Sequence, residues 1–172
     1  MPTPVRVLIL EERASDAELM VHELAQAGFE PNWQRVETET DYIAQLQAVP
    51  DVILADHNLP GFGAPQALEL LKEHGLDIPF IVVTGSINEE VAVERIKQGA
   101  ADYILKDRMA RLGAAVKHAL QEKKLREGKR KADEEIKRNL ERIRALHEIN
   151  LAITSTLNLR SVLDFLVERL DS

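Results

Sequence analysis

The chain has 172 residues, of which 45% are apolar, 30% are charged and only 4% are aromatic, so we expect a core built mainly from Leu, Ile, Val and Ala. It contains no cysteine, which excludes disulfides, thiol catalysis and zinc–thiolate sites and fits a cytoplasmic protein. No apolar run reaches the roughly 18 residues of a membrane span, and no charged-then-apolar leader precedes Val5. The sequence therefore predicts neither a membrane segment nor a secretory signal.

The charge is unevenly spread. Residues 1–120 carry 19 acidic and 10 basic side chains, which argues against a nucleic-acid surface, because phosphate backbones attract clustered Lys and Arg. Residues 121–142 are basic, with 9 Lys and Arg against 6 Asp and Glu, but the two signs are interspersed. This pattern favours a solvated helix, so we expect no direct contact with nucleic acid.

Strand-like and helix-like segments alternate up to about residue 120. The β-rich segments lie at 5–10, 33–36 (the weakest), 51–55, 80–84 and 102–105. Helical patterns occupy 15–27, 39–49 with Thr38 as cap, 64–74, and 88–98 with Asn88 as cap, and helix resumes after Asp107. Because the strands are apolar throughout, the pattern predicts a doubly wound α/β domain with a five-stranded parallel sheet.

A long helix is predicted from about Met109 to Thr154-Ser155-Thr156, where we expect it to stop. Its apolar residues recur at steps of three or four and form one stripe: Ile136, Leu140, Ile143, Leu146, Ile149 and Ile153. The stripe either packs back onto the domain or forms a parallel dimeric coiled coil. We favour the coiled coil, and hence a homodimer, because residues 121–135 are too polar to pack on a core.

Chemically active side chains follow four of the predicted strands. Glu11 and Glu12 end the first strand, Asp56 the third, Thr84 the fourth and Lys106 the fifth. The carboxyl ends of parallel strands meet at one edge of a sheet, where function is usually found. Carboxylates suit Mg²⁺, a carboxylate beside such a cation can attack phosphorus, and a lysine and a hydroxyl can bind phosphoryl oxygens.

The ordered motifs Glu11-Glu12, Asp56-His57-Asn58-Leu59-Pro60-Gly61, Thr84-Gly85 and Gly99-Ala100-Ala101-Asp102-Tyr103-Ile104-Leu105-Lys106 resemble a response-regulator receiver domain of two-component signalling. The resemblance covers residues 4–122 and implies the strand order 2-1-3-4-5. It also implies a switch in a phosphorelay, not a conventional enzyme, with a sensor histidine kinase or a phosphotransfer protein as partner.

The same resemblance assigns the site residues. Asp56 is the implied phosphoryl acceptor, and Lys106 would pair with the phosphoryl group while Thr84 moves to hydrogen-bond it. Tyr103 would change rotamer as Thr84 moves. The implied Mg²⁺ ligands are Glu11, Glu12, Asp56 and the Asn58 backbone carbonyl.

Two residues depart from the family pattern. Both members of the acidic pair are Glu, whereas the family usually has at least one Asp there, and Asp107 stands where many members have a proline, often after a cis bond. The longer side chains of Glu11 and Glu12 leave open a pseudo-receiver, which keeps the fold and acts as an interaction module without phosphorylation. A Mg²⁺-dependent phosphohydrolase using Asp56 as nucleophile ranks last, because the adjacent loop offers no second acid/base carboxylate.

The tail from Leu140 to Ser172 is similar to the entry into a GAF domain, with a second helix from an Asn158 cap to about Leu170. We therefore expect a receiver domain at 1–120, a helical linker with a possible coiled coil at 121–154, and the truncated start of a GAF-like domain at 155–172.

Overall fold

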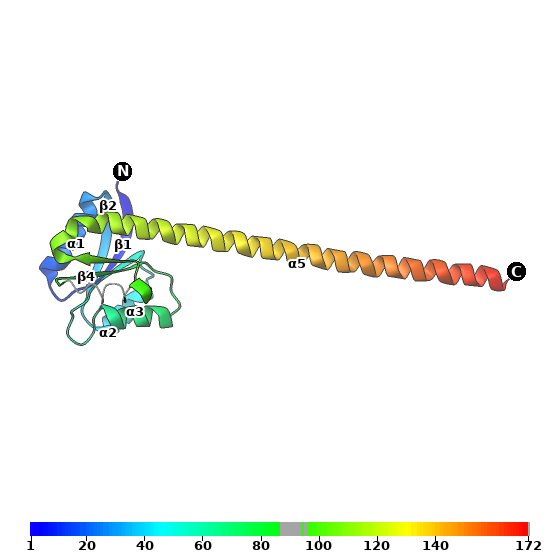
Figure 1. Ribbon diagram of the computed structural model, residues 1–172, viewed down its shortest axis with the longest axis horizontal. Helices are drawn as coiled ribbons and strands as arrows, with labels where there is room; N and C mark the ends of the chain where they lie inside the picture. The colour runs from blue at the N-terminus through cyan, green and yellow to red at the C-terminus, as the bar shows by residue number, and fades with distance from the viewer. Residues whose placement is uncertain (87–93, 95, 172) are drawn as a thin grey trace. The chain divides into compact units, whose positions relative to one another are not determined.

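The computed structural model describes residues 1–86, 94 and 96–171 (Figure 1). Its elements, in chain order, are β1 (Thr3–Leu10), α1 (Ala14–Gln26), β2 (Phe29–Val36), α2 (Glu39–Leu46), β3 (Val52–Asp56), α3 (Ala64–Glu73), β4 (Phe80–Thr84), β5 (Asp102–Leu105), the 3₁₀ helix η1 (Lys106–Arg111) and α5 (Leu112–Leu170). The helix predicted at 88–98 lies mostly outside the described residues.

The five strands form one parallel sheet in the order β2-β1-β3-β4-β5. The predicted doubly wound fold and its strand order are thus confirmed. β2 is longer than the predicted 33–36, because its first residues pair with β1 from Thr3↔Phe29 onward. Pro31 lacks an N–H but is tolerated in β2, because β2 is an edge strand with one side unpaired.

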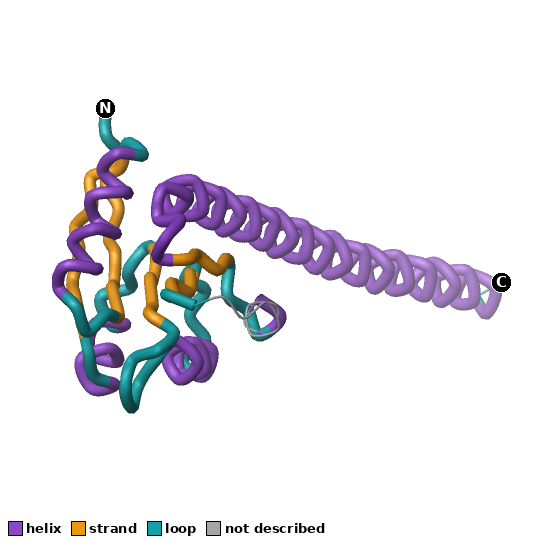
Figure 2. Tube along the Cα trace, turned by 60° about the vertical axis from the view of Figure 1, so that its left-hand side comes forward, coloured by secondary structure: helices purple, strands orange, loops and turns teal. Residues whose placement is uncertain are grey.

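Alternate residues of the strands enter two separate cores. Val5, Val7 and Ile9 of β1 pack with α1 and the start of α5, whereas Leu8 and Leu10 pack with α2 and α3. Helices accordingly lie on both sides of the strands (Figure 2). Burial of β3 and β4 on both faces explains why their sequences read as continuous apolar runs.

Local signals fix the helices next to the sheet. Thr38 caps α2 as predicted, because its hydroxyl accepts a hydrogen bond of 3.2 Å from the Asp41 N–H. Gly113 lets the start of α5 approach α1 closely, since a Cβ added there would lie 2.2 Å from the Ala27 Cβ. The start of α5 therefore packs against α1 through the smallest possible side chain.

α5 continues through Thr154-Ser155-Thr156 to Leu170, so the predicted stop and the separate second helix are wrong. The hydroxyls of Thr154 and Thr156 donate to the carbonyls of Asn150 and Ala152, four residues earlier, at 2.9 Å each. These bonds satisfy the hydroxyls inside the helix, so the threonines do not end it.

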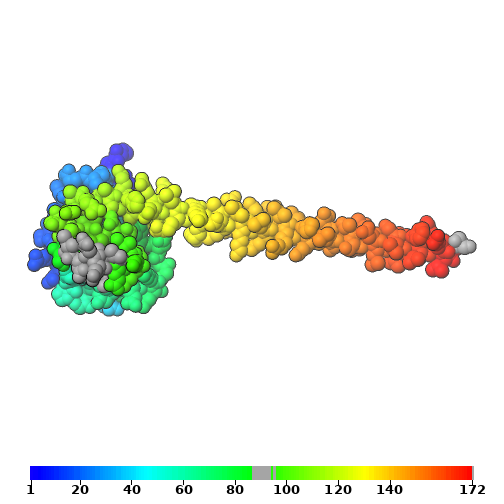
Figure 3. Space-filling view, in the orientation of Figure 1, coloured from blue at the N-terminus to red at the C-terminus, as the bar shows by residue number. Residues whose placement is uncertain are grey.

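The chain divides into two compact units, residues 1–125 and 126–172. In the second unit every residue from 128 to 171 is exposed, including the predicted stripe from Ile136 to Ile153. Figure 3 shows one face of this segment, coloured from yellow to red. No helix within the described part of the chain is both long enough and apolar enough to cross a membrane.

Candidate phosphoacceptor site

Three carboxylates converge on the Lys106 ammonium group at the carboxyl ends of the strands. Lys106 Nζ donates to Glu11 Oε2 at 2.9 Å, to Asp16 Oδ2 at 2.7 Å and to Asp56 Oδ2 at 2.9 Å. Glu11 follows β1, Asp56 ends β3, Lys106 follows β5, and Asp16 belongs to the first turn of α1. The parallel topology thus brings together residues up to 95 positions apart.

Backbone groups orient two of these carboxylates. The Arg13 N–H donates to Glu11 Oε1 at 2.9 Å, and the Asn58 N–H donates to Asp56 Oδ1 at 3.0 Å. Each carboxylate is therefore held by its own loop through one oxygen and meets Lys106 through the other. The fixed orientation leaves little freedom to the Asp56 side chain.

The site carries more negative than positive charge. Glu11 is 1% exposed and Asp56 9%, and three carboxylates against one ammonium leave a formal charge of −2. Burial raises the pKa of Glu11 above its ordinary value, although hydrogen bonds from Arg13 and Lys106 oppose this. Burial lowers the pKa of Lys106, but its hydrogen bonds to Asp16, Asp56 and Glu11 outweigh this and raise it above its ordinary value. Burial thus favours the protonated form of Glu11, and the hydrogen bonds to three carboxylates favour the protonated form of Lys106.

Thr84 and Tyr103, the predicted switch residues, both contact Ser86. Thr84 is fully buried at the end of β4, and its hydroxyl accepts a hydrogen bond from the Ser86 N–H at 3.4 Å. The Tyr103 hydroxyl donates to the Ser86 carbonyl, also at 3.4 Å. Ser86, which the sequence analysis did not single out, therefore links the two.

The other predicted site residues lie around this cluster. Glu12 is exposed, and its backbone carbonyl accepts a hydrogen bond of 2.9 Å from Arg35. The Lys106–Asp107 peptide bond is trans. Sequence reasoning missed Asp16, although the first turn of a helix that follows β1 necessarily starts near the edge where β1 ends.

Oxygen donors suited to Mg²⁺ are present, but they surround an ammonium group. Within residues 1–86, 94 and 96–171, no three Asp, Glu or His side chains form a group that could hold a metal ion. Magnesium needs only one or two protein carboxylates, with water and phosphate completing its shell. The donor chemistry of Glu11 and Asp56 and the formal charge of −2 therefore fit a divalent cation.

Comparison with known families shows to which protein family the chain belongs. The response regulator receiver domain matches residues 7–117, well over half of the chain. The chain belongs to this family. The match ends before the tail, so the GAF-like resemblance of residues 140–172 receives no support.

Curated relatives of this receiver are regulators. It is 37% identical over 107 residues to the phosphate regulon transcriptional regulatory protein PhoB of Klebsiella pneumoniae, with 59% of this chain and 44% of the relative covered. It is 41% identical over 58 residues to the nitrate/nitrite response regulator protein NarL of Escherichia coli, covering 34% of this chain and 27% of the relative. The chain thus spans less than half the length of these relatives. The word transcriptional in the first name weakens our expectation of no direct nucleic-acid contact.

Solved structures show the same fold. The signal receiver domain of a Vibrio parahaemolyticus protein described as a Luxo repressor superposes with a TM-score of 0.64 at 26% identity, over 72% of this chain and 95% of that one. A response regulator receiver domain protein from Clostridium thermocellum gives a TM-score of 0.62 at 20% identity, over 70% and 98%.

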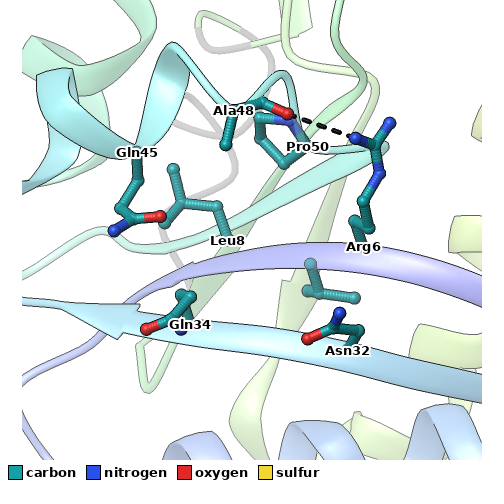
Figure 4. Close-up of a pocket in the computed structure, with 8 residues that line it drawn as sticks. Arg6, Leu8, Asn32, Gln34, Gln45, Ala48 and Pro50 are labelled. Carbon is teal, nitrogen blue, oxygen red and sulfur yellow. Dashed lines mark hydrogen bonds between the residues drawn. The ribbon is translucent and has the colours of Figure 1, made fainter.

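The receiver also has a hollow of about 240 Å³ away from the acidic site. Figure 4 shows Gln45 and the Ala48–Pro50 segment on one side and Asn32 and Gln34 of β2 on the other. Arg6 closes one end, donating to the Ala48 carbonyl at 3.2 Å and to Asp51 Oδ1 at 3.1 Å. The lining is mostly amide and apolar, so the hollow lacks the carboxylates that characterise the strand ends.

Proposed function

We propose that Asp56 accepts a phosphoryl group and that the receiver is a phosphorylation-dependent switch, not a conventional enzyme. The observation that carries this proposal is the convergence of Glu11, Asp16 and Asp56 on Lys106 at the carboxyl ends of the strands. Asp56 is oriented by the Asn58 N–H and lies beside a cation that is able to bind phosphoryl oxygens. The phosphoryl donor is a sensor histidine kinase or a phosphotransfer protein, which the family membership supports. The transfer takes place in the cytoplasm, as the absence of cysteine suggests.

In the proposed transfer, an Asp56 carboxylate oxygen attacks phosphorus and forms the new P–O bond. The P–N bond to the kinase histidine breaks, its electron pair returns to the imidazole, and the departing nitrogen takes a proton from solvent. Lys106 exchanges its hydrogen bond to Asp56 for one to the phosphoryl group, which offsets the added negative charge.

Glu11, Glu12, Asp56 and the Asn58 backbone carbonyl would hold Mg²⁺. When bound, the cation supplies charge neutralisation for the incoming phosphoryl group. Glu11 is suited to this role, because its carboxylate is buried and aimed at the same place as that of Asp56. Glu12 is exposed and would contribute from the rim of the site.

The switch would run from Thr84 through Ser86 to Tyr103. A Thr84 hydroxyl that turns toward the phosphoryl group gives up its hydrogen bond from the Ser86 N–H, and Ser86 also holds the Tyr103 hydroxyl. Tyr103 lies in β5, and Lys106 is the first residue of η1, which leads into α5. Phosphorylation would therefore affect the structure at the start of α5.

The output would be delivered by a homodimer through α5. Its exposed apolar stripe from Ile136 to Ile153, with steps of three or four residues, has the spacing that a second helix covers in a coiled coil. Sedimentation velocity tests this: Ile149→Lys should convert a dimer into a monomer, whereas Glu148→Lys, one residue off the stripe, should leave the dimer intact. A wild type that sediments as a monomer would refute the dimer, and an Ile149→Lys variant that remains a dimer would refute the stripe as its interface.

The pseudo-receiver remains the second candidate, and the exposure of Glu12 favours it. Intact mass after incubation with Mg²⁺ and acetyl phosphate separates the two functions. A gain of one phosphoryl group in the wild type, absent from Asp56→Asn and from a sample with chelator, supports the phosphoacceptor. An unchanged mass in a folded protein supports the pseudo-receiver.

A further inference from the structure

Asp16 makes the shortest of the three contacts with Lys106. Its Oδ2 lies 2.7 Å from Lys106 Nζ, compared with 2.9 Å for Glu11 and for Asp56. The carboxylate is only 26% exposed, so water competes weakly for this hydrogen bond. Asp16 is not one of the residues through which the receiver family was recognised in this sequence, and the transfer proposed above gives it no role.

The Lys106 ammonium group has three N–H donors, and each of them is used. It can contact a phosphoryl oxygen only by releasing one carboxylate. Asp56 is the partner that releases it, because the new acyl phosphate bond removes the carboxylate charge of Asp56 and places the phosphoryl oxygens beside it. The hydrogen bonds to Glu11 and Asp16 then remain, and they hold the Lys106 ammonium group in place while it contacts the phosphoryl group.

We propose that Asp16 is a positioning residue that, together with Glu11, anchors Lys106 at the acceptor site. This inference rests on the proposed function of Asp56. Asp16 is carried by the first turn of α1 and Lys106 by the start of η1, so their contact joins two elements on the same side of the sheet. An unanchored lysine at a site only partly closed to water has many alternative rotamers, and Asp16 removes them.

The test compares Asp16→Asn with Glu18→Gln, which removes the same charge from an exposed position of α1. The first measurement, on the unphosphorylated full chain, is hydrogen exchange of the Lys106 ammonium protons by ¹⁵N NMR. Asp16→Asn should speed this exchange by about tenfold, because one of three charge-assisted hydrogen bonds becomes a weaker neutral one. Glu18→Gln should stay within about twofold of wild type, since it touches no donor of Lys106.

The second measurement is the rate of phosphorylation by acetyl phosphate at saturating Mg²⁺. Asp16→Asn should lower it several-fold in the wild-type background and cause no further loss in a Lys106→Met background, because it acts through Lys106. Equal losses in both backgrounds, or exchange unchanged by Asp16→Asn, would overturn the proposal. If the wild type accepts no phosphoryl group, the proposed function fails, whereas the exchange measurement still decides whether Asp16 anchors Lys106.

Discussion

The approach of α1 to α5 at Gly113 predicts that Gly113→Ala destabilises the receiver. The added methyl would lie 2.2 Å from the Ala27 Cβ, so the two helices must separate by about 1.2 Å to restore an ordinary contact of 3.4 Å. Overpacking of this kind costs about 1–3 kcal/mol, and the better helix propensity of alanine returns about 1 kcal/mol. We therefore expect the free energy of unfolding to fall by about 0–2 kcal/mol relative to wild type, and by about 1–3 kcal/mol relative to a glycine-to-alanine change at an uncrowded helix position.

Gly128→Ala is the matched control, because the same added Cβ meets nothing within 4 Å. Urea unfolding followed by Trp33 fluorescence is a suitable assay, since the only tryptophan packs against the core formed by α1 and the start of α5. The midpoint should fall for Gly113→Ala and should not fall for Gly128→Ala. A Gly113→Ala protein as stable as Gly128→Ala would refute the inference that contact with Ala27 requires glycine.

Three further predictions concern the remainder of the first unit. Val49 has a φ of +49°, unfavourable for a β-branched residue, so Val49→Asn should raise the free energy of unfolding by about 1 kcal/mol in urea titrations; a loss would show that the Val49 side chain contributes packing instead. The buried Tyr42 hydroxyl donates to the Ala67 carbonyl at 2.9 Å, so Tyr42→Phe should lower the free energy of unfolding by about 1 kcal/mol, and an unchanged thermal midpoint would contradict this. Burial raises the pKa of Asp51, but hydrogen bonds from Arg6 outweigh this and lower it. The stability that Asp51 contributes should therefore be present above about pH 4 and disappear as the pH falls through its lowered pKa, so the urea midpoints of wild type and Asp51→Asn should converge in acid and differ at neutral pH.

Much of the sheet was predictable because each buried strand is a continuous run of apolar residues in the sequence. β4 begins and ends where the apolar run Phe80–Thr84 does, and β5 coincides with its predicted range. The first half of β2 was missed, because its polar residues alternate with half-buried ones and Pro31 argues against a strand. Pairing with β1, a non-local interaction, makes these residues a strand.

The site was predictable only where residues end strands. Glu11, Asp56 and Lys106 meet because parallel topology places the carboxyl ends of β1, β3 and β5 at one edge. Asp16 was missed because an Asp in the first turn of a helix is commonly explained by the helix dipole alone. Nothing local in the sequence reveals that its carboxylate reaches a lysine 90 positions away.

The end of the long helix was misplaced for a similar reason. Thr154-Ser155-Thr156 is a cluster of residues that often cap helices or form turns, but their hydroxyls have an alternative partner in the preceding helical turn. Without a proline or glycine after Gly128, no residue forces the helix to end before Leu170.

The continuity of α5 also restricts which changes in chain length it can accept. Each residue advances an α-helix by about 100°, so an insertion of two residues after Glu141 turns every later side chain by about 200° around the helix axis. The later part of the exposed stripe, from Ile143 to Ile153, would then leave the helix face on which Ile136 and Leu140 lie. A seven-residue insertion restores the phase to within about 20°. Natural variants of this helix should therefore differ in length by multiples of seven residues.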